Sequence, residues 1–165
     1  MISKKIVFSK KWFDLFEIKD EFTKSDFYGI KPPDYVTAVA FDNDGMIILV
    51  NQRRPVIGKK NSLETPGGQV DKGETPLESI NKELREELGM SFEIVENICV
   101  LEPDVGRLMN KLYVFKAEKP NKIGDPEKGI KIMRIKPEKV FNLINEKELT
   151  NAYSIAALSV VLRRF

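Results

Sequence analysis

The sequence predicts an α/β domain in which a mixed β-sheet is packed between helices. Short runs of branched and aromatic residues, typical of strands, are interspersed with amphipathic segments typical of helices. These two kinds of segment do not alternate regularly along the chain, and that order favours a mixed sheet. With 165 residues, of which 42% are hydrophobic, the chain can build one domain with a sizeable core.

The first 33 residues alternate bulky apolar and charged side chains, as in the run from Trp12 to Ile18. That alternation predicts one or two antiparallel strands. The segment ends at Pro32 and Pro33, which cannot donate hydrogen bonds to a sheet ladder. We therefore expect an N-terminal antiparallel strand segment over residues 1–33 and the main domain over residues 34–165.

A β-hairpin is expected at the start of the main domain. The apolar runs 36–41 and 46–50 flank a turn that ends in Asp44-Gly45, and an Asp-Gly pair is a strong hairpin signal. Further strands are expected over residues 93–102, 111–117 and 130–135, with Gly- and Pro-bearing loops between them.

Three helices are expected, and the first has clear signals at both ends. Thr75 is a suitable N-cap, Glu78 completes a capping box with it, and Gly89 supplies the stop. Two further helices close the chain, one from near Pro137 and one from near Asn151.

Composition excludes several classes of protein. The chain has no histidine, which rules out Ser-His-Asp triads, Cys-His dyads and histidine-built zinc sites. Its 27 basic and 25 acidic residues leave a charge of +2, too balanced to indicate nucleic-acid binding. Cys99 is the single cysteine, and no segment is typical of a signal peptide or a membrane span. We expect a cytoplasmic protein that acts on small ligands.

Carboxylates crowd one edge of the first predicted helix. At 100° per residue, Glu83, Glu86 and Glu87 share an arc of about 100° beside an apolar arc. Like charges at this spacing are unfavourable unless a cation lies near them, and Mg²⁺ prefers oxygen ligands of this kind. The alternative is a solvated ladder of i, i+4 ion pairs formed by Glu78, Lys82 and Glu86. The apolar arc consists of Leu77, Ile80, Leu84 and Leu88.

The window from Gly68 to Met90 resembles the Nudix box, whose pattern is Gly-x5-Glu-x7-Arg-Glu-aliphatic-x-Glu-Glu-x-Gly-aliphatic. One of the nine defined positions departs from it, because Lys82 stands where the family has Arg. Lysine keeps the charge but lacks the planar, two-pronged geometry, so we expect a looser scaffold. The eight matches are Gly68, Glu74, Glu83, Leu84, Glu86, Glu87, Gly89 and Met90.

This resemblance implies a Nudix-type α/β/α sandwich that hydrolyses diphosphate linkages with Mg²⁺ or Mn²⁺. It implies that Glu83 and Glu87 are the principal metal ligands. Glu86, directly or through water, and the Gly67 carbonyl would be further ligands, and Glu74 would help to fix the loop. For the general base, the related ADP-sugar enzymes use a loop acid, and in the loop 121–129 the candidates are Glu127 first and Asp125 second.

Two stretches outside the box look like the ADP-ribose and ADP-sugar pyrophosphatase branch of the family. They are Gln52-Arg53-Arg54-Pro55 and the segment Glu64-Thr65-Pro66 before the box, similar to Gln-x-Arg-Pro and Glu-Leu-Pro. Arg54 would then contact phosphate, with Glu64 also in the substrate site; the alternative for Arg54 is a surface position at a strand end.

Three further implications of this resemblance concern substrate and assembly. Arg107 is a candidate for phosphate or sugar contact, or else a solvated turn residue, and Asn110 lies near a position where ADP-ribose enzymes often have Glu. In that branch the N-terminal strands commonly exchange or pack across a homodimer. Four aromatic residues of that segment are candidates for stacking on a base or, in the alternative, for packing in the core or dimer: Trp12, Phe16, Phe27 and Tyr28.

The combined prediction is metal-dependent cleavage of a nucleoside diphosphate sugar into a nucleoside monophosphate and a sugar phosphate. The alternative substrates are a dinucleotide, a nucleoside triphosphate or another nucleoside diphosphate-linked compound. A Nudix domain that binds a ligand without hydrolysing it is less favoured, because Glu83, Glu86 and Glu87 are all retained.

Overall fold

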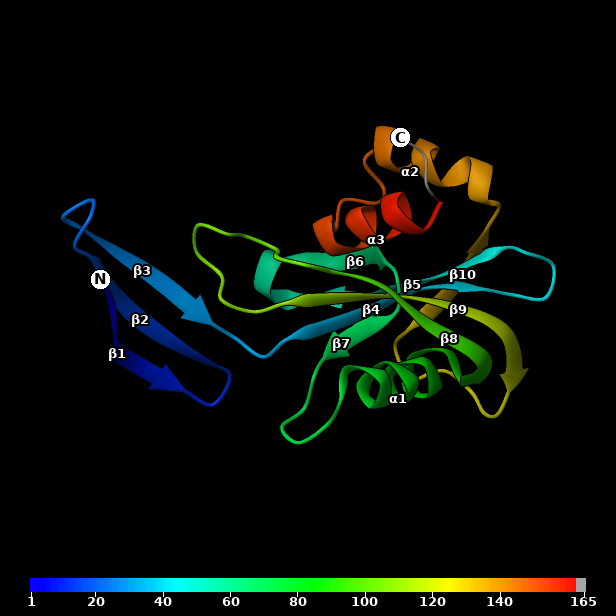
Figure 1. Cartoon of the computed structure of the whole chain (residues 1–165). Helices are drawn as coiled ribbons and strands as arrows, with labels where there is room; N and C mark the ends of the chain where they lie inside the picture. Colours follow the sequence, from blue (N-terminus) through cyan, green and yellow to red (C-terminus); the bar gives the residue numbers. More distant parts are fainter. Residues whose placement is uncertain (163–165) are drawn as a thin grey trace.

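The computed structural model describes residues 1–162 and contains, over that range, two β-sheets and three α-helices (Figure 1). The last three residues of the predicted main domain, 163–165, lie outside the described residues. The strands are β1 (Ile2–Lys10), β2 (Phe13–Asp20), β3 (Ser25–Lys31), β4 (Tyr35–Phe41), β5 (Ile47–Arg54), β6 (Lys59–Glu64), β7 (Gly67–Gln69), β8 (Met90–Leu101), β9 (Leu112–Lys122) and β10 (Lys131–Ile135). The helices are α1 (Pro76–Leu88), α2 (Val140–Asn145) and α3 (Ala152–Leu162), with short 3-10 helices at Pro55–Ile57 and Pro137–Lys139.

The larger sheet has seven strands and is mixed. Its order is β10-β5-β4-β9-β8, with β6 beside β5 and β7 beside β4. Strands β4 and β9 are parallel, whereas every other described pair in this sheet is antiparallel. Helix α1 covers one face, and α2 and α3 cover the other (Figure 1). The predicted α/β/α sandwich is therefore confirmed.

Two apolar layers hold the helices to this sheet. On one face Ile80, Leu84 and Leu88 of α1 are buried against the strands. On the other face the buried residues are Val140 and Leu143 of α2, Ala157 and Leu158 of α3, and Leu149 of the connection between these helices. Leu77, predicted to be buried with the α1 stripe, is 48% exposed. It lies in the first turn of α1, before Ile80, which is the first residue of the helix to join this core.

The N-terminal segment forms a separate antiparallel sheet of three strands, β1-β2-β3, where one or two were expected. The additional strand follows a turn in which the Asp20 carboxylate accepts hydrogen bonds from the backbone N–H groups of Phe22 and Thr23. This sheet projects from the sandwich (Figure 1). Ile30 attaches it, since its N–H donates to the Arg107 carbonyl at 2.7 Å and its carbonyl accepts from Met109 N–H at 2.9 Å.

The hairpin predicted around Asp44-Gly45 is present but short. Strands β4 and β5 pair only at Ala40 with Ile48 and at Phe41 with Ile47. Farther along, β7 takes the edge of β4 and β6 lies beside β5. The sequence did not predict β6 and β7, because one is polar and the other is largely glycine. Their position matters, because β7 carries Gly67 to the end of α1 where the carboxylates lie.

Within the described residues, no helix combines the length and the apolar character needed to cross a membrane.

Candidate active site

Helix α1 is fixed at both ends. At its start Thr75 Oγ1 accepts from the Glu78 N–H at 3.3 Å, and Glu78 Oε2 accepts from the Thr75 N–H at 2.7 Å, which is the predicted capping box. At its end Gly89 has a φ of 64°, and a Cβ there would collide with the backbone of Gly124 and Asp125. The loop 121–129 is thereby held against the C-terminal turn of α1.

A close approach between β7 and β4 brings Gly67 to α1. A Cβ at Gly67 would collide with the Val36 carbonyl, so no larger residue fits this strand pairing. The Gly67 N–H donates to Glu87 Oε2 at 2.8 Å. The Gly67 carbonyl accepts from the Tyr35 hydroxyl at 3.2 Å. Gln52 Nε2 donates to the other oxygen of Glu87 at 3.1 Å, so both oxygens of this carboxylate are oriented.

The three carboxylates of α1 have different surroundings. Glu87 is 5% exposed, Glu83 is half-buried and Glu86 is exposed. The Glu83 carboxylate fills the space in which Gly68 would carry a side chain, so any larger residue at position 68 would displace it. The glycine at this position therefore leaves room for an acid.

Burial raises the pKa of both inner carboxyl groups. For Glu83, desolvation raises the pKa to about 7, and the negative charges of Glu86, Asp71 and Glu127 add to the effect. For Glu87, desolvation again raises the pKa to about 7, against the lowering effect of the Gly67 N–H bond. Two neighbouring acids that are difficult to ionise form a site that a bound cation would stabilise.

A pocket of about 360 Å³ opens beside these acids. The donors around it are carboxylate and carbonyl oxygens, the ligand chemistry that suits Mg²⁺ or Mn²⁺. In residues 1–162 no three Asp, Glu or Cys side chains are gathered closely enough around one point to hold an ion as they stand. The donor set fits a hard divalent cation by its chemistry. The pocket is lined by Trp12, Tyr35, Arg54, Gly67, Gly68, Gln69, Asp71, Glu83 and Glu87.

Arg54 and Glu64 form a two-pronged ion pair at one side of this pocket. Arg54 Nε donates to Glu64 Oε1 at 3.0 Å and Arg54 Nη2 to Glu64 Oε2 at 2.7 Å. This hydrogen-bonded carboxylate raises the pKa of Arg54 above its usual range, so the guanidinium stays charged. Arg54 also borders a second hollow of about 360 Å³, which is lined by Tyr35, Arg54, Glu64, Asn151, Ala152 and Tyr153.

Lys82, which stands at the arginine position of the box, contacts two carboxylates at different distances. Its ammonium donates to Asp71 Oδ2 at 2.6 Å and lies 3.4 Å from Glu74 Oε1. Glu74 instead accepts a 2.6 Å bond from the Ser79 hydroxyl. A lysine ammonium is a compact charge that binds one carboxylate closely, and here that carboxylate belongs to Asp71. The Ser79 hydroxyl therefore makes the shorter hydrogen bond to Glu74.

The loop acids and Arg107 differ in how near they come to the pocket. The Glu127 N–H donates to the Glu86 carbonyl at 2.8 Å, which brings this residue to the acidic edge of α1. Asp125 is 91% exposed and pairs with Lys122 at 3.5 Å. Arg107 is 80% exposed, pairs with Asp104 at 3.6 Å and is not among the residues that line the pocket.

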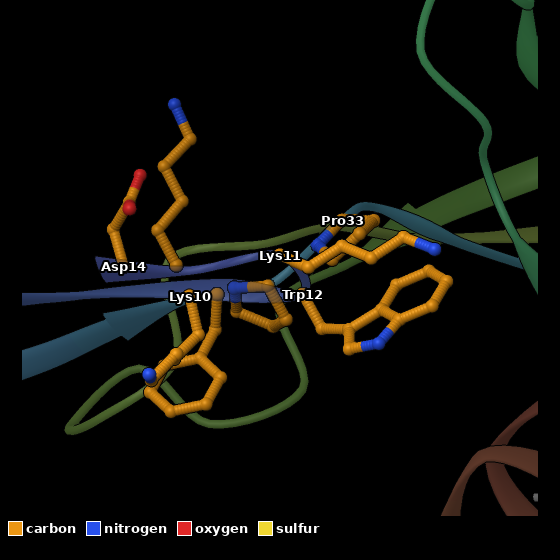
Figure 2. Close-up of a pocket in the computed structure, with 8 residues that line it drawn as sticks. Lys10, Lys11, Trp12, Asp14 and Pro33 are labelled. Atoms are coloured by element: carbon orange, nitrogen blue, oxygen red, sulfur yellow. The ribbon is translucent and has the colours of Figure 1, made fainter.

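Sequence reasoning did not assign Gln52, Tyr35, Gln69 or Asp71 to the site. Gln52 stands within the Gln-Arg-Arg-Pro stretch, and Asp71 occupies a variable position of the box. Tyr35 belongs to no motif. Trp12 was considered for stacking or packing, and here it is one of the residues that line this pocket. It also borders a separate hollow on the N-terminal sheet, where Lys11 Nζ lies 4.4 Å from its ring centroid (Figure 2). Only the arrangement of the sheets brings Trp12 and Tyr35 to the acids.

Comparison with known proteins agrees with this geometry. A family model described as the NUDIX domain matches residues 31–156. The chain is 27% identical over 166 residues to an ADP-ribose pyrophosphatase of Bacillus subtilis (strain 168), covering 95% of this chain and 89% of the relative. It is also 27% identical over 134 residues to a methanol dehydrogenase activator of Bacillus methanolicus, covering 78% of this chain and 72% of the relative.

Solved structures show the same fold. A crystal structure of an ADP compounds hydrolase superimposes with a TM-score of 0.82 at 19% identity, covering 99% of this chain and 92% of that one. A structure of MutT, from a study of Aliivibrio salmonicida and Vibrio cholerae, gives a TM-score of 0.62 at 18% identity over 79% of this chain and 97% of that one.

Proposed function

Because this chain belongs to the Nudix family and is a hydrolase of phosphoric anhydride bonds, we propose that it cleaves the diphosphate linkage of a nucleoside diphosphate sugar. The products would be a nucleoside monophosphate and a sugar phosphate. The observation that carries this proposal is one pocket lined by the half-buried Glu83, the buried Glu87, the charged Arg54 and Trp12. Similarity to an ADP-ribose pyrophosphatase along most of the chain supports an ADP-sugar as the substrate class.

The acidic edge of α1 is the proposed site of a divalent cation, Mg²⁺ or Mn²⁺. Glu83 and Glu87 would be the principal ligands, Glu86 would contribute directly or through water, and the Gly67 carbonyl would supply a further oxygen. A bound cation supplies positive charge for the diphosphate oxygens and lowers the pKa of a bound water. The Gly67 N–H and Gln52 hold the Glu87 carboxylate in a single orientation toward this task.

Arg54 is the proposed phosphate-binding residue. A guanidinium has five N–H donors, and Glu64 accepts from two of its nitrogens, Nε and Nη2. The buried Glu64 holds the guanidinium plane, so the other guanidinium donors would bind phosphate oxygens in a fixed direction. Glu64 would thus act on the substrate through Arg54. Arg107 remains a weaker candidate for contact with sugar or phosphate.

Glu127 is the proposed general base. Its negative charge contributes to the raised pKa of Glu83, which indicates that the two side chains lie within electrostatic reach. Its backbone is bonded to the C-terminal turn of α1 at Glu86. Asp125, the second candidate, is directed to Lys122 instead. Glu127 is therefore the better placed of the two to accept a proton from the attacking water.

Another nucleoside diphosphate-linked compound is the second candidate substrate. It is favoured by Asn110, which lies near a position where enzymes active on ADP-ribose often carry a glutamate. Asn110 is buried, and its Nδ2 donates to the Pro33 carbonyl at 3.2 Å. An amide held in this way cannot replace a free carboxylate, so ADP-ribose itself is a weaker candidate than a related NDP-sugar or dinucleotide.

We further propose that the protein acts in the cytoplasm as a homodimer, with residues 1–33 as a distinct N-terminal unit.

The test is the release of nucleoside monophosphate from ADP-, GDP- and UDP-sugars, dinucleotides and nucleoside triphosphates, each with Mg²⁺ or Mn²⁺. We expect the fastest release from one NDP-sugar and a loss of at least about 100-fold in Glu87→Gln, because that variant keeps the volume but removes a ligand charge. Full activity in Glu87→Gln would contradict the metal assignment. Preference for a triphosphate would contradict the proposed substrate class.

A further inference from the structure

A chain of buried hydroxyl groups lies behind the loop that carries Gly67. It joins Thr37 of β4, Thr65 of the β6–β7 connection and Ser154 of α3, which are 1%, 4% and 2% exposed. The hydroxyl oxygens of Thr37 and Thr65 are 2.6 Å apart, and those of Thr65 and Ser154 are 3.0 Å apart. Ser154 Oγ donates onward to Asn151 Oδ1 at 3.2 Å and also accepts from the Thr65 N–H at 2.9 Å.

The proton count of these hydroxyls couples the members to one another. Each hydroxyl has one proton to donate. Either Thr37 donates to Thr65 and Thr65 to Ser154, or Thr65 donates to Thr37 and Thr37 to the Pro66 carbonyl at 3.2 Å. Only the second arrangement gives the Pro66 carbonyl a hydroxyl donor, and in it Ser154 is held to residue 65 by the Thr65 N–H. Thr37 is therefore the hydroxyl through which this group reaches the Pro66 peptide.

The hydroxyl chain acts on the peptide that contacts the acids. The Pro66 carbonyl accepts from the Ala38 N–H at 2.9 Å and from the Thr37 hydroxyl at 3.2 Å. This carbonyl and the Gly67 N–H belong to the same peptide unit, which is planar and trans. Holding the oxygen on one side therefore directs the N–H on the other side at Glu87 Oε2, 2.8 Å away.

We propose that the Thr37 hydroxyl, with Thr65 as its neighbouring hydrogen-bond partner, is a positioning group for the divalent-cation site, because its bond to the Pro66 carbonyl sets the direction of the Gly67 N–H and of the following Gly67 carbonyl. This inference rests on the proposed function, which makes Glu87 and the Gly67 carbonyl ligands of the ion. None of the three hydroxyls touches the pocket, so they act only through the peptide. Partners that orient metal ligands in this way typically change metal affinity or activity by roughly 10- to 100-fold when they are removed.

The test compares Thr37→Val with Thr37→Ser, with Mn²⁺ binding to the intact protein measured by calorimetry. Valine matches the shape of threonine and removes the hydroxyl that reaches the Pro66 carbonyl, while the bond from the Ala38 N–H to that carbonyl stays in place. We expect Thr37→Val to bind Mn²⁺ about 10-fold more weakly, whereas Thr37→Ser stays within about 3-fold of the parent. The matched control is Ser159→Ala, because the Ser159 hydroxyl donates only to Ile155 O of its own helix at 2.8 Å.

Steady-state kinetics separate positioning from general weakening of the fold. At subsaturating Mn²⁺ we expect Thr37→Val to lower kcat by about 10-fold and to change KM for the nucleotide by less than about 3-fold. Unchanged Mn²⁺ affinity in Thr37→Val, with a lowered Tm alone, would overturn the positioning role and leave the proposed function standing. A parent protein that binds no Mn²⁺ but hydrolyses its substrate with Mn²⁺ absent would overturn both.

Discussion

The burial of Glu83 and Glu87 sets how the site responds to pH. Both pKa values are raised by desolvation from the ordinary 4.5 to about 7. Between about pH 4.5 and 7 the folded protein therefore retains protons that the unfolded chain releases, so the free energy of unfolding falls as the pH rises through this window. The contribution of these two groups is fully present below about pH 4.5 and is lost above about pH 7.

This sign gives a prediction for the metal-free protein. In EDTA the parent protein should lose Tm between pH 5.5 and pH 8 more steeply than Glu87→Gln, because glutamine never ionises and accepts the same Gly67 N–H bond. Addition of Mg²⁺ at pH 8 should restore the Tm of the parent and leave that of the variant unchanged, as measured by thermal unfolding. Parallel pH curves for the two proteins would show that burial of Glu87 is not linked to its titration.

Gly68 gives a second prediction at the scale of one residue. Gly68→Ala places a methyl group where the Glu83 carboxylate lies, and a flexible carboxylate can move aside at little cost to the fold. We expect a change of less than about 1 kcal/mol in the free energy of unfolding but at least a roughly 10-fold loss of Mn²⁺ affinity. Gly124→Ala is the matched control, because nothing lies within 4 Å of a Cβ at that position. Equal metal affinities in the two variants would remove Glu83 from the ligand set.

At the scale of elements, the connection between β7 and α1 is held by two separate contacts, because Lys82 stands where the box has an arginine. Lys82 binds Asp71 across the loop, and Ser79 binds Glu74 at the first turns of the helix. Asp71 and Lys82 are both substantially exposed, so their ion pair contributes little on its own. The bond from the buried Ser79 is expected to contribute more, on the order of 1 kcal/mol.

A double-mutant cycle tests this division of roles. Ser79→Ala should lower the free energy of unfolding by about 1 kcal/mol in the parent and by about half as much in Lys82→Arg. The reason is that a two-pronged guanidinium reaches Asp71 and Glu74 together, so the serine becomes partly redundant. Urea denaturation of the four proteins gives the coupling energy. Strictly additive effects would mean that Ser79 does not compensate for the lysine.

At the scale of the whole molecule, the three-stranded sheet of residues 2–31 is unusual because large apolar side chains remain exposed on it. A small isolated sheet is marginally stable in water, and contiguous exposed apolar surface commonly marks an interface. The charged residues that alternate with these apolar side chains leave them exposed to solvent. A second copy of the chain is the proposed partner. The exposed residues are Ile2, Ile6, Val7, Phe8, Trp12, Phe13, Phe22, Phe27, Tyr28 and Ile30.

The proposed homodimer is tested by a substitution that introduces one negative charge on this three-stranded sheet. Analytical ultracentrifugation of the parent should give twice the 18.9 kDa of one chain, and Ile6→Asp should shift the distribution toward the monomer, because a carboxylate buried in an apolar interface lacks a partner. Val100→Asp, which changes a comparably exposed residue on β8 of the larger sheet, is the control. A monomeric parent, or a dimer unaffected by Ile6→Asp, would contradict the proposed interface.

The sequence by itself determined the features that depend on near neighbours in the chain. The capping box at Thr75, the stop at Gly89 and the acidic edge of α1 follow from spacing within one helix, because helical geometry fixes which residues share a face. The mixed sheet and its helical layers also followed, since strand and helix patterns are local. The short strands β6 and β7 did not, because their polar or glycine-rich sequences carry weak local patterns. The third N-terminal strand was not resolved from its neighbours by the alternation of residues 1–33, although β3 carries Phe27, Tyr28 and Ile30.

Tertiary structure alone decided which distant residues complete the site. Trp12 of the β1–β2 turn, Tyr35 of β4 and Arg54 of β5 come to the same pocket, and the buried hydroxyls of Thr65 and Ser154 meet across 89 positions of sequence. No spacing rule links such residues, because their distances depend on strand pairing and on how α3 packs over β4. The family motif located the acids, while the pairing of β4 with β7 and the packing of the helices determined what surrounds them.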